Sequence, residues 1–139
     1  MRKKHKAKKA SPAFLKDPVF HARVWIFYRW EPEALVRFLK KHYPEMTGTD
    51  SGMLDQYLAR DSRCASTVYL EDMGTSIMSL RSPGDTKLEE LGTFVHEAVH
   101  VAFFQMERKG LYLNRETDEV YAYFTEYITK QCVEVAATL

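Results

Sequence analysis

One twelve-residue segment restricts the possible fold more than any other part of the chain. It runs from Thr93 to Phe104, reads TFVHEAVHVAFF, and contains only three ionisable side chains, His96, Glu97 and His100. Drawn as a helix, the segment is apolar on every side, which predicts a helix buried inside the domain. Burying three ionisable groups together is costly unless they pair with one another or bind a metal ion. The segment therefore predicts a core helix that carries a polar site.

The three ionisable residues match the pattern H-E-x-x-H. Residues four apart share one face of a helix, so the imidazoles of His96 and His100 can bind one ion, with Glu97 close beside it. Two neutral imidazoles and a carboxylate are what a zinc hydrolase uses to hold Zn²⁺ and to accept a proton from water. The alternative is structural: two core histidines that form hydrogen bonds with Glu97 and with backbone carbonyls.

Composition predicts a single ordinary domain. The chain has 139 residues, of which 45% are hydrophobic and 28% are charged, as is common for globular proteins. It contains no apolar run near the roughly 20 residues that span a bilayer, and its basic start is not followed by a signal-peptide pattern. Cys64 and Cys132 lack C-x-x-C spacing, and two reduced thiols fit a cytoplasmic protein. We therefore expect a cytoplasmic protein without membrane contact, although a Cys64–Cys132 disulfide is left open.

The first residues form a separate region. Six of the 20 lysine and arginine residues lie within residues 2–9, so the rest of the chain has an excess of acidic side chains. A block of like charges predicts a disordered tail, assigned to residues 1–12, with the folded domain at 13–139. Such a tail can contact nucleic acid weakly, or it can simply improve solubility.

The rest of the chain alternates between strand and helix signals. The segment 11–20, with two prolines, is predicted to be irregular, and 47–52 is predicted to be a loop. Apolar patterns and turn residues predict strands at 23–30, 66–71 and 75–81, and helices at 32–42, 53–60, 87–109 and 117–137. Thr86 and Glu89 form a capping box, and Gly110 is placed to end the metal helix. This order predicts an α+β domain.

The metal site needs a third ligand, which must be a carboxylate because no histidine follows His100. Glu107, two turns along the same helix, is too far from His100 to share an ion. The candidates lie at the start of the final helix: Glu119 and Glu126, followed by Asp118 and Glu116. If this helix packs antiparallel to the metal helix, its start returns close to the histidines.

At this point the chain resembles a known family. Eighteen residues separate His100 from Glu119, and Glu119 begins the segment EVYAY. This arrangement is similar to the gluzincins, such as thermolysin-like proteases, and to the small ImmA-like zincins of bacteria, phages and prophages. The resemblance covers about residues 66–128. It implies that His96, His100 and Glu119 bind zinc and that Glu97 is the catalytic base.

The resemblance also implies a fold and an activity. The fold is a minimal zincin-like domain, in which a small antiparallel or mixed sheet packs on the H-E-x-x-H helix and on a following antiparallel helix. The activity is cleavage of peptide bonds in a protein or peptide held along an edge strand, for which 75–81 is the candidate. Tyr123 is a candidate to stabilise the oxyanion, and Glu126 to assist around the metal. The alternatives are a catalytically inactive zincin-fold protein that binds nucleic acid through its tail, and a hydrolase of non-peptide amides.

Overall fold

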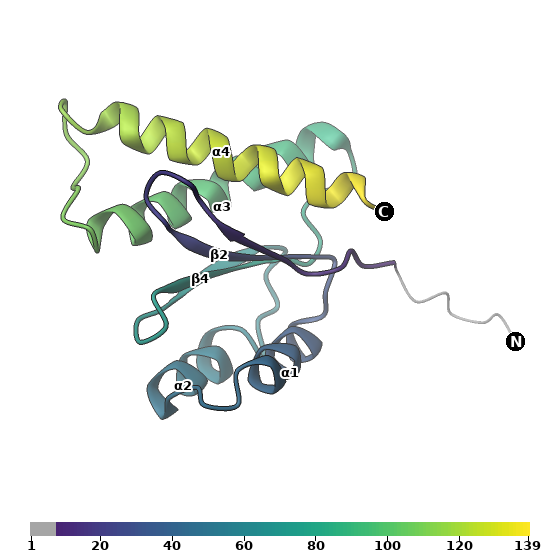
Figure 1. Ribbon diagram of the computed structural model, residues 1–139. Coiled ribbons are helices and arrows are strands. Elements are labelled where there is room, and N and C mark those ends of the chain that lie inside the picture. Colours follow the sequence, from purple (N-terminus) through teal and green to yellow (C-terminus); the bar gives the residue numbers. More distant parts are fainter. Residues whose placement is uncertain (1–7) are drawn as a thin grey trace, which may run out of the picture.

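The computed structural model describes residues 8–139 and forms an α+β domain with a mixed sheet of four strands and four helices (Figure 1). The elements follow in the order β1 (Ala13–Lys16), β2 (Arg23–Tyr28), α1 (Pro32–His42), α2 (Gly48–Tyr57), β3 (Ser66–Leu70), β4 (Thr75–Leu80), α3 (Lys87–Glu107) and α4 (Asp118–Ala137). The predicted fold class is confirmed at this level.

The sheet has the strand order β1-β2-β4-β3. β2 and β4 pair in parallel in the centre, and β1 and β3 pair antiparallel to them at the two edges. The interpretation of β4 as an edge strand is therefore wrong, because β4 is paired on both sides. A strand's own residues do not reveal which partners it will have, and the free edge of the sheet near α3 (Lys87–Glu107) belongs to β3.

Helices cover both faces of the sheet (Figure 1). Side chains alternate along each strand, so Trp25 and Phe27 of β2 pack against α1 and α2, whereas Val24 and Ile26 pack against α3 and α4. The same alternation places Ile77 of β4 on the α1–α2 face. The result is a three-layer domain with a separate apolar core on each side of the sheet.

The N-terminal part of the described chain is more ordered than its sequence indicated. Within 11–20, residues 13–16 form β1, and Pro18 lies in the turn that follows. The buried carboxylate of Asp17 closes this turn by accepting hydrogen bonds from the backbone N–H groups of Val19, Phe20 and Ala22. The turn thus depends on one polar side chain.

The predicted tail is only partly described, because residues 1–7 lie outside the described part of the chain. Within its last residues, Ala10 is buried, and its carbonyl accepts a hydrogen bond from Nε1 of Trp30 at 2.8 Å. Lys9 places its ammonium 3.7 Å from the centre of the Trp30 ring. The packed chain therefore begins before residue 13. The predicted nucleic-acid contact of residues 2–9 falls mostly outside the described residues.

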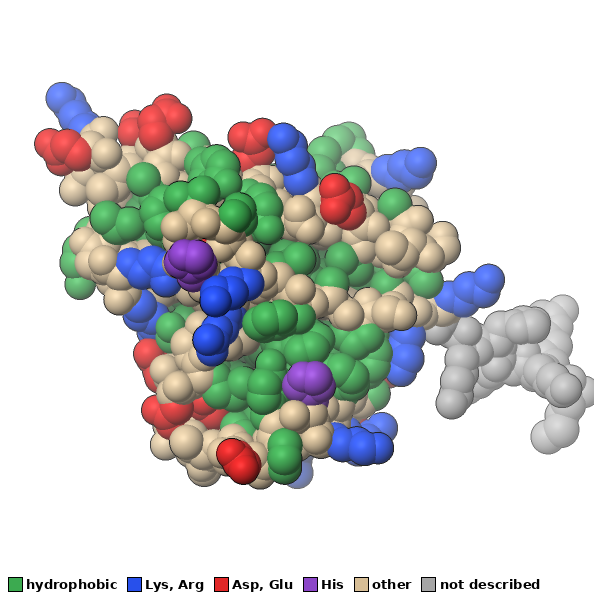
Figure 2. Space-filling view, in the orientation of Figure 1, with side chains coloured by type: hydrophobic (Ala, Val, Ile, Leu, Met, Phe, Trp, Pro, Cys, Tyr) green, Lys and Arg blue, Asp and Glu red, His purple; other side chains and the backbone are tan. Residues whose placement is uncertain are grey.

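Charge on the visible face of the domain is mixed. Figure 2 shows basic and acidic side chains interspersed there, together with hydrophobic ones. No helix in residues 8–139 is both long enough and apolar enough to cross a membrane. Both cysteines are free: Cys132 is buried, where desolvation raises its thiol pKa to about 12, and Cys64 is exposed. The Cys64–Cys132 disulfide left open by the sequence is thus not formed.

Local signals define most of the helix ends. Thr47 caps α2 by accepting the N–H of Asp50, so the helix begins within the predicted loop 47–52. Thr86 and Glu89 form the predicted capping box at the start of α3. At its end, Gly110 has a φ of +75° and donates to Glu107 O, while Leu111 donates to Met106 O. These two bonds form a Schellman motif with Gly110 in its expected role.

Gly84 offers a test of the connection between β4 and α3. A Cβ at this position would lie 2.6 Å from Glu89 Cβ and 2.8 Å from Glu90 N, in the first turn of α3. Gly84→Ala should therefore lower the free energy of unfolding by about 1–3 kcal/mol, as measured by urea denaturation.

The matched control is Gly52→Ala in α2, where a Cβ would meet nothing within 4 Å. Replacing a helical glycine in open space should raise the free energy of unfolding by roughly 0.5–1 kcal/mol. Equal stability of the Gly84→Ala variant and the wild-type protein would contradict the close approach.

Candidate metal centre

α3 is buried on one side rather than on every side. Its core face is built from small and apolar residues, including Phe94, Ala98 and Ala102, and packs on the sheet and on α4. Val95 and Val99 are 40% and 37% exposed, although their sequence context predicted full burial. An all-apolar pattern cannot indicate which side of a helix remains uncovered. His96 and His100 belong to the uncovered side.

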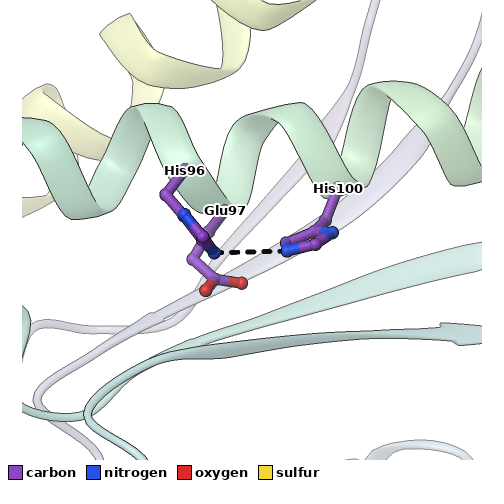
Figure 3. Close-up of side chains that lie close together, drawn as sticks. All are labelled: His96, Glu97 and His100. Carbon is purple, nitrogen blue, oxygen red and sulfur yellow. Dashed lines mark hydrogen bonds between the residues drawn. The ribbon is translucent and has the colours of Figure 1, made fainter.

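The structure brings His96, Glu97 and His100 together, and this group could hold a metal ion. Their nearest ligand atoms all lie within 4.8 Å of one another. Nε2 of His96 and Nε2 of His100 are 3.3 Å apart, and Figure 3 shows them facing each other with the Glu97 carboxylate beside them. Both imidazoles are exposed, so solvent reaches them, whereas Glu97 is only 5% exposed. The structural alternative, in which the histidines bond to Glu97, is not what this geometry shows.

Glu97 is held from the opposite side by the sheet. Thr67 lies on β3, and its hydroxyl donates to Oε2 of Glu97 at 2.6 Å. The alternation of β3 directs Val68 to the α1–α2 core and leaves Thr67 facing α3. Thr67 therefore orients the carboxylate relative to the two imidazoles. The sequence did not identify this residue, because nothing local to 66–71 shows that β3 will lie beside α3.

The other predicted site residues lie outside this cluster. Glu119 is exposed in the first turn of α4, where its backbone N–H donates to Asp118. Glu126 is exposed and forms an ion pair with Lys130 at 2.7 Å, which lowers the pKa of Glu126. The ring of Tyr123 is 41% exposed and stacks on Tyr127. α3 and α4 do form the expected antiparallel pair (Figure 1), but the pair does not bring these side chains to the histidines.

A groove runs along the free edge of β3, next to the cluster. We call it the edge groove. It lies between α2 and the C-terminal half of α3, and its lining includes Tyr57, Arg63, Thr67, Tyr69, Phe104 and Arg108. Two of these residues also contact the cluster: Thr67 binds Glu97, and the Phe104 ring stacks on His100 with 6.4 Å between ring centres. The edge groove thus lies next to the candidate metal cluster and shares two of its contact residues.

One end of the edge groove is fixed by Arg108. Its Nε donates to both carboxylate oxygens of Glu71 at 3.1 Å, and its guanidinium lies 4.2 Å from the Tyr69 ring centre. These hydrogen bonds lower the pKa of Glu71 and raise that of Arg108. A paired and stacked guanidinium joins the end of β3 to α3, next to Phe104.

Comparison with known proteins adds no assignment: no family model matches the chain, and no curated protein or solved structure is significantly similar to it.

The role of Thr67 can be tested by stability. Thr67→Val keeps the shape and the strand preference but leaves the buried Glu97 carboxylate without its hydroxyl donor. We expect the free energy of unfolding at pH 7 to fall by about 1–3 kcal/mol in urea denaturation. Thr67→Ser keeps the hydroxyl and should remain within about 1 kcal/mol of the wild-type protein. A Thr67→Val variant as stable as Thr67→Ser would contradict the proposed orientation of Glu97.

Proposed function

We propose that this protein is a zinc-dependent hydrolase of peptide bonds with a zincin-like site. The observation that carries the proposal is the 3.3 Å separation of the two Nε2 atoms beside the Glu97 carboxylate. Two nitrogens that bind one tetrahedral zinc ion at about 2.0–2.1 Å are roughly 3.3–3.4 Å apart. The separation of the two nitrogens therefore suits the binding of one Zn²⁺ ion.

In the proposed hydrolysis, zinc and the side chains of the protein have different roles. When bound, zinc supplies a Lewis acid that polarises a carbonyl and lowers the pKa of water to about 7. His96 and His100 hold the ion through Nε2. Glu97 accepts the proton of the attacking water and passes it to the leaving amine. Thr67 would hold the carboxylate of Glu97 beside the two imidazoles through its hydrogen bond to Oε2.

The edge groove is the reason for proposing a peptide as the substrate. An extended peptide can add to a free sheet edge through backbone hydrogen bonds, and β3 is a free edge beside the histidines. The aromatic rings of Tyr57, Tyr69 and Phe104 provide apolar surface for the alternate side chains of such a strand. We therefore assign to β3 the substrate role that the sequence assigned to 75–81.

We propose the third protein ligand of the zinc ion from the spacing of residues in the sequence. Catalytic zinc usually has three protein ligands and one open position, and the cluster supplies two imidazoles. Glu119 is the first candidate, since it matches the gluzincin spacing and lies on the helix that packs against α3. Glu119 lies outside the cluster, so this ligand requires the first turn of α4 to approach the histidines on metal binding. Glu126 is the second candidate.

Zinc binding tests the site directly. Titration of metal-free protein with zinc chloride in a calorimeter should give one ion per chain. His96→Ala and His100→Ala should each abolish this binding, because one imidazole alone cannot hold the ion. Glu119→Ala should weaken it by at least about tenfold, the loss seen even for residues that act through a ligand.

A control histidine lies in the turn between β1 and β2. His21 has a φ of +56°, a conformation that asparagine tolerates, so His21→Asn should fold and bind zinc as the wild-type protein does. Unchanged zinc affinity in Glu119→Ala, together with a loss in Glu126→Ala, would move the third ligand to Glu126. Unchanged affinity in the two histidine variants would reject the cluster as the zinc site.

The base is tested by Glu97→Gln, which removes the proton acceptor but keeps the size and polarity of the side chain. We expect hydrolysis of unfolded casein by the zinc-loaded protein to fall by roughly 10²–10⁴-fold, with the zinc content unchanged. Full activity in this variant would exclude Glu97 as the base. Zinc binding without cleavage of casein in the wild-type protein would instead favour a binding role, or another amide substrate.

A further inference from the structure

Arg63 is a cation in the edge groove that the proposed reaction has not used. It lies in the loop between α2 and β3 and lines the same groove as Thr67, the residue that binds Glu97. Its side chain is 64% exposed, so a ligand in the groove can reach it. Arg108, the other cation of the groove, is already occupied by Glu71.

The position of Arg63 is fixed at one atom only. Asp61, whose side chain is 9% exposed, accepts the Nε–H of Arg63 at 3.0 Å and its backbone N–H at 2.9 Å. Burial raises the pKa of Asp61, but the hydrogen bonds from Arg63 and Ser66 outweigh this effect and lower it below its usual value. Among residues 8–139, neither terminal amino group of Arg63 donates a hydrogen bond. The guanidinium is therefore anchored through Nε, with both Nη groups available.

We propose that Arg63 binds a carboxylate of the peptide substrate and so gives the enzyme a preference for an acidic group at one position near the cleaved bond. This inference rests on the proposed function and specifies its substrate class. The two Nη groups form a planar fork that matches the two oxygens of a carboxylate, which a neutral amide cannot match. The anchor at Nε reduces the rotational freedom lost on binding.

Two kinds of carboxylate can provide this group: an acidic side chain within a peptide, or the C-terminus of the peptide. Three sets of fluorescein-labelled decapeptides separate them. The first carries a single Glu, moved through each position, with an amidated C-terminus. The second has Gln in place of that Glu and is also amidated. The third has Gln and a free C-terminal carboxylate.

Two measurements are made with each set. Cleavage is followed by chromatography with the zinc-loaded protein, and binding by fluorescence anisotropy with zinc-loaded Glu97→Gln. At one position, or at the free C-terminus, the acidic peptide should bind about tenfold more tightly than its neutral match, the ratio that a charge-assisted hydrogen bond gives. Adding Arg63→Ala to Glu97→Gln should remove this ratio, and Arg63→Lys should keep only part of it.

Arg60→Ala is the matched control, because Arg60 is an exposed arginine near the end of α2 that does not line the edge groove. It should leave the ratio unchanged. Tighter binding of the acidic peptides that is lost in Arg63→Ala supports the inference, even if no peptide is cleaved. In that case only the proposed hydrolysis fails. Cleavage or binding of all three sets with equal efficiency overturns the inference and leaves the hydrolase proposal intact. An equal loss for acidic and neutral peptides in Arg63→Ala also overturns it, because the variant then acts through the fold and not through a bound carboxylate.

Discussion

The site depends on how α3 is rotated about its own axis on the sheet. Ala98 and Ala102 allow the helix to approach closely, and Gln105 fixes it by donating from Nε2 to the carbonyl of Arg23 and to the hydroxyl of Ser76. With this face held, residues 96 and 100 turn to solvent and residue 97 turns toward β3. A rotation of the helix by one residue position would bury an imidazole and separate Glu97 from Thr67. The buried amide of Gln105 and the apolar residues beside it thus hold the helix in the rotation that orients the cluster.

Much of the secondary structure could be predicted because its causes are local. Pro32 begins α1, Thr86 and Glu89 cap α3, and Gly110 closes it, each through contacts within a few residues. One error is local, because α2 begins at Gly48 behind the Thr47 cap rather than at residue 53. The other errors concern contacts between distant segments. β1 is stabilised by pairing with β2. The sequence of β4 does not show that this strand pairs on both sides, and the sequence of α3 does not show which side of the helix is exposed. Periodicity describes one element at a time, whereas an edge or a buried face is a property of the assembled sheet.

The candidate site divides in the same way. His96, Glu97 and His100 come together because positions one and four apart on a helix are neighbours, so their proximity could be predicted from spacing. Thr67 and Arg63 reach the site through the pairing of β3 and the loop before it, which spacing cannot express. Glu119 shows where prediction from spacing fails. Its distance from the histidines depends on how α3 and α4, which are joined by residues 108–117, pack against each other.

The free edge of β3 has a cost as well as a use. The same edge that we propose for peptide binding can also pair with the edge of another copy of the protein, which is a common route to aggregation. Two features of this strand oppose such self-association. It is only five residues long, and charged side chains stand near both ends, Arg63 before it and the Glu71–Arg108 pair after it. A short strand with charged residues near both ends suits the proposed binding of a short peptide and offers other copies of the protein only a short edge to pair with.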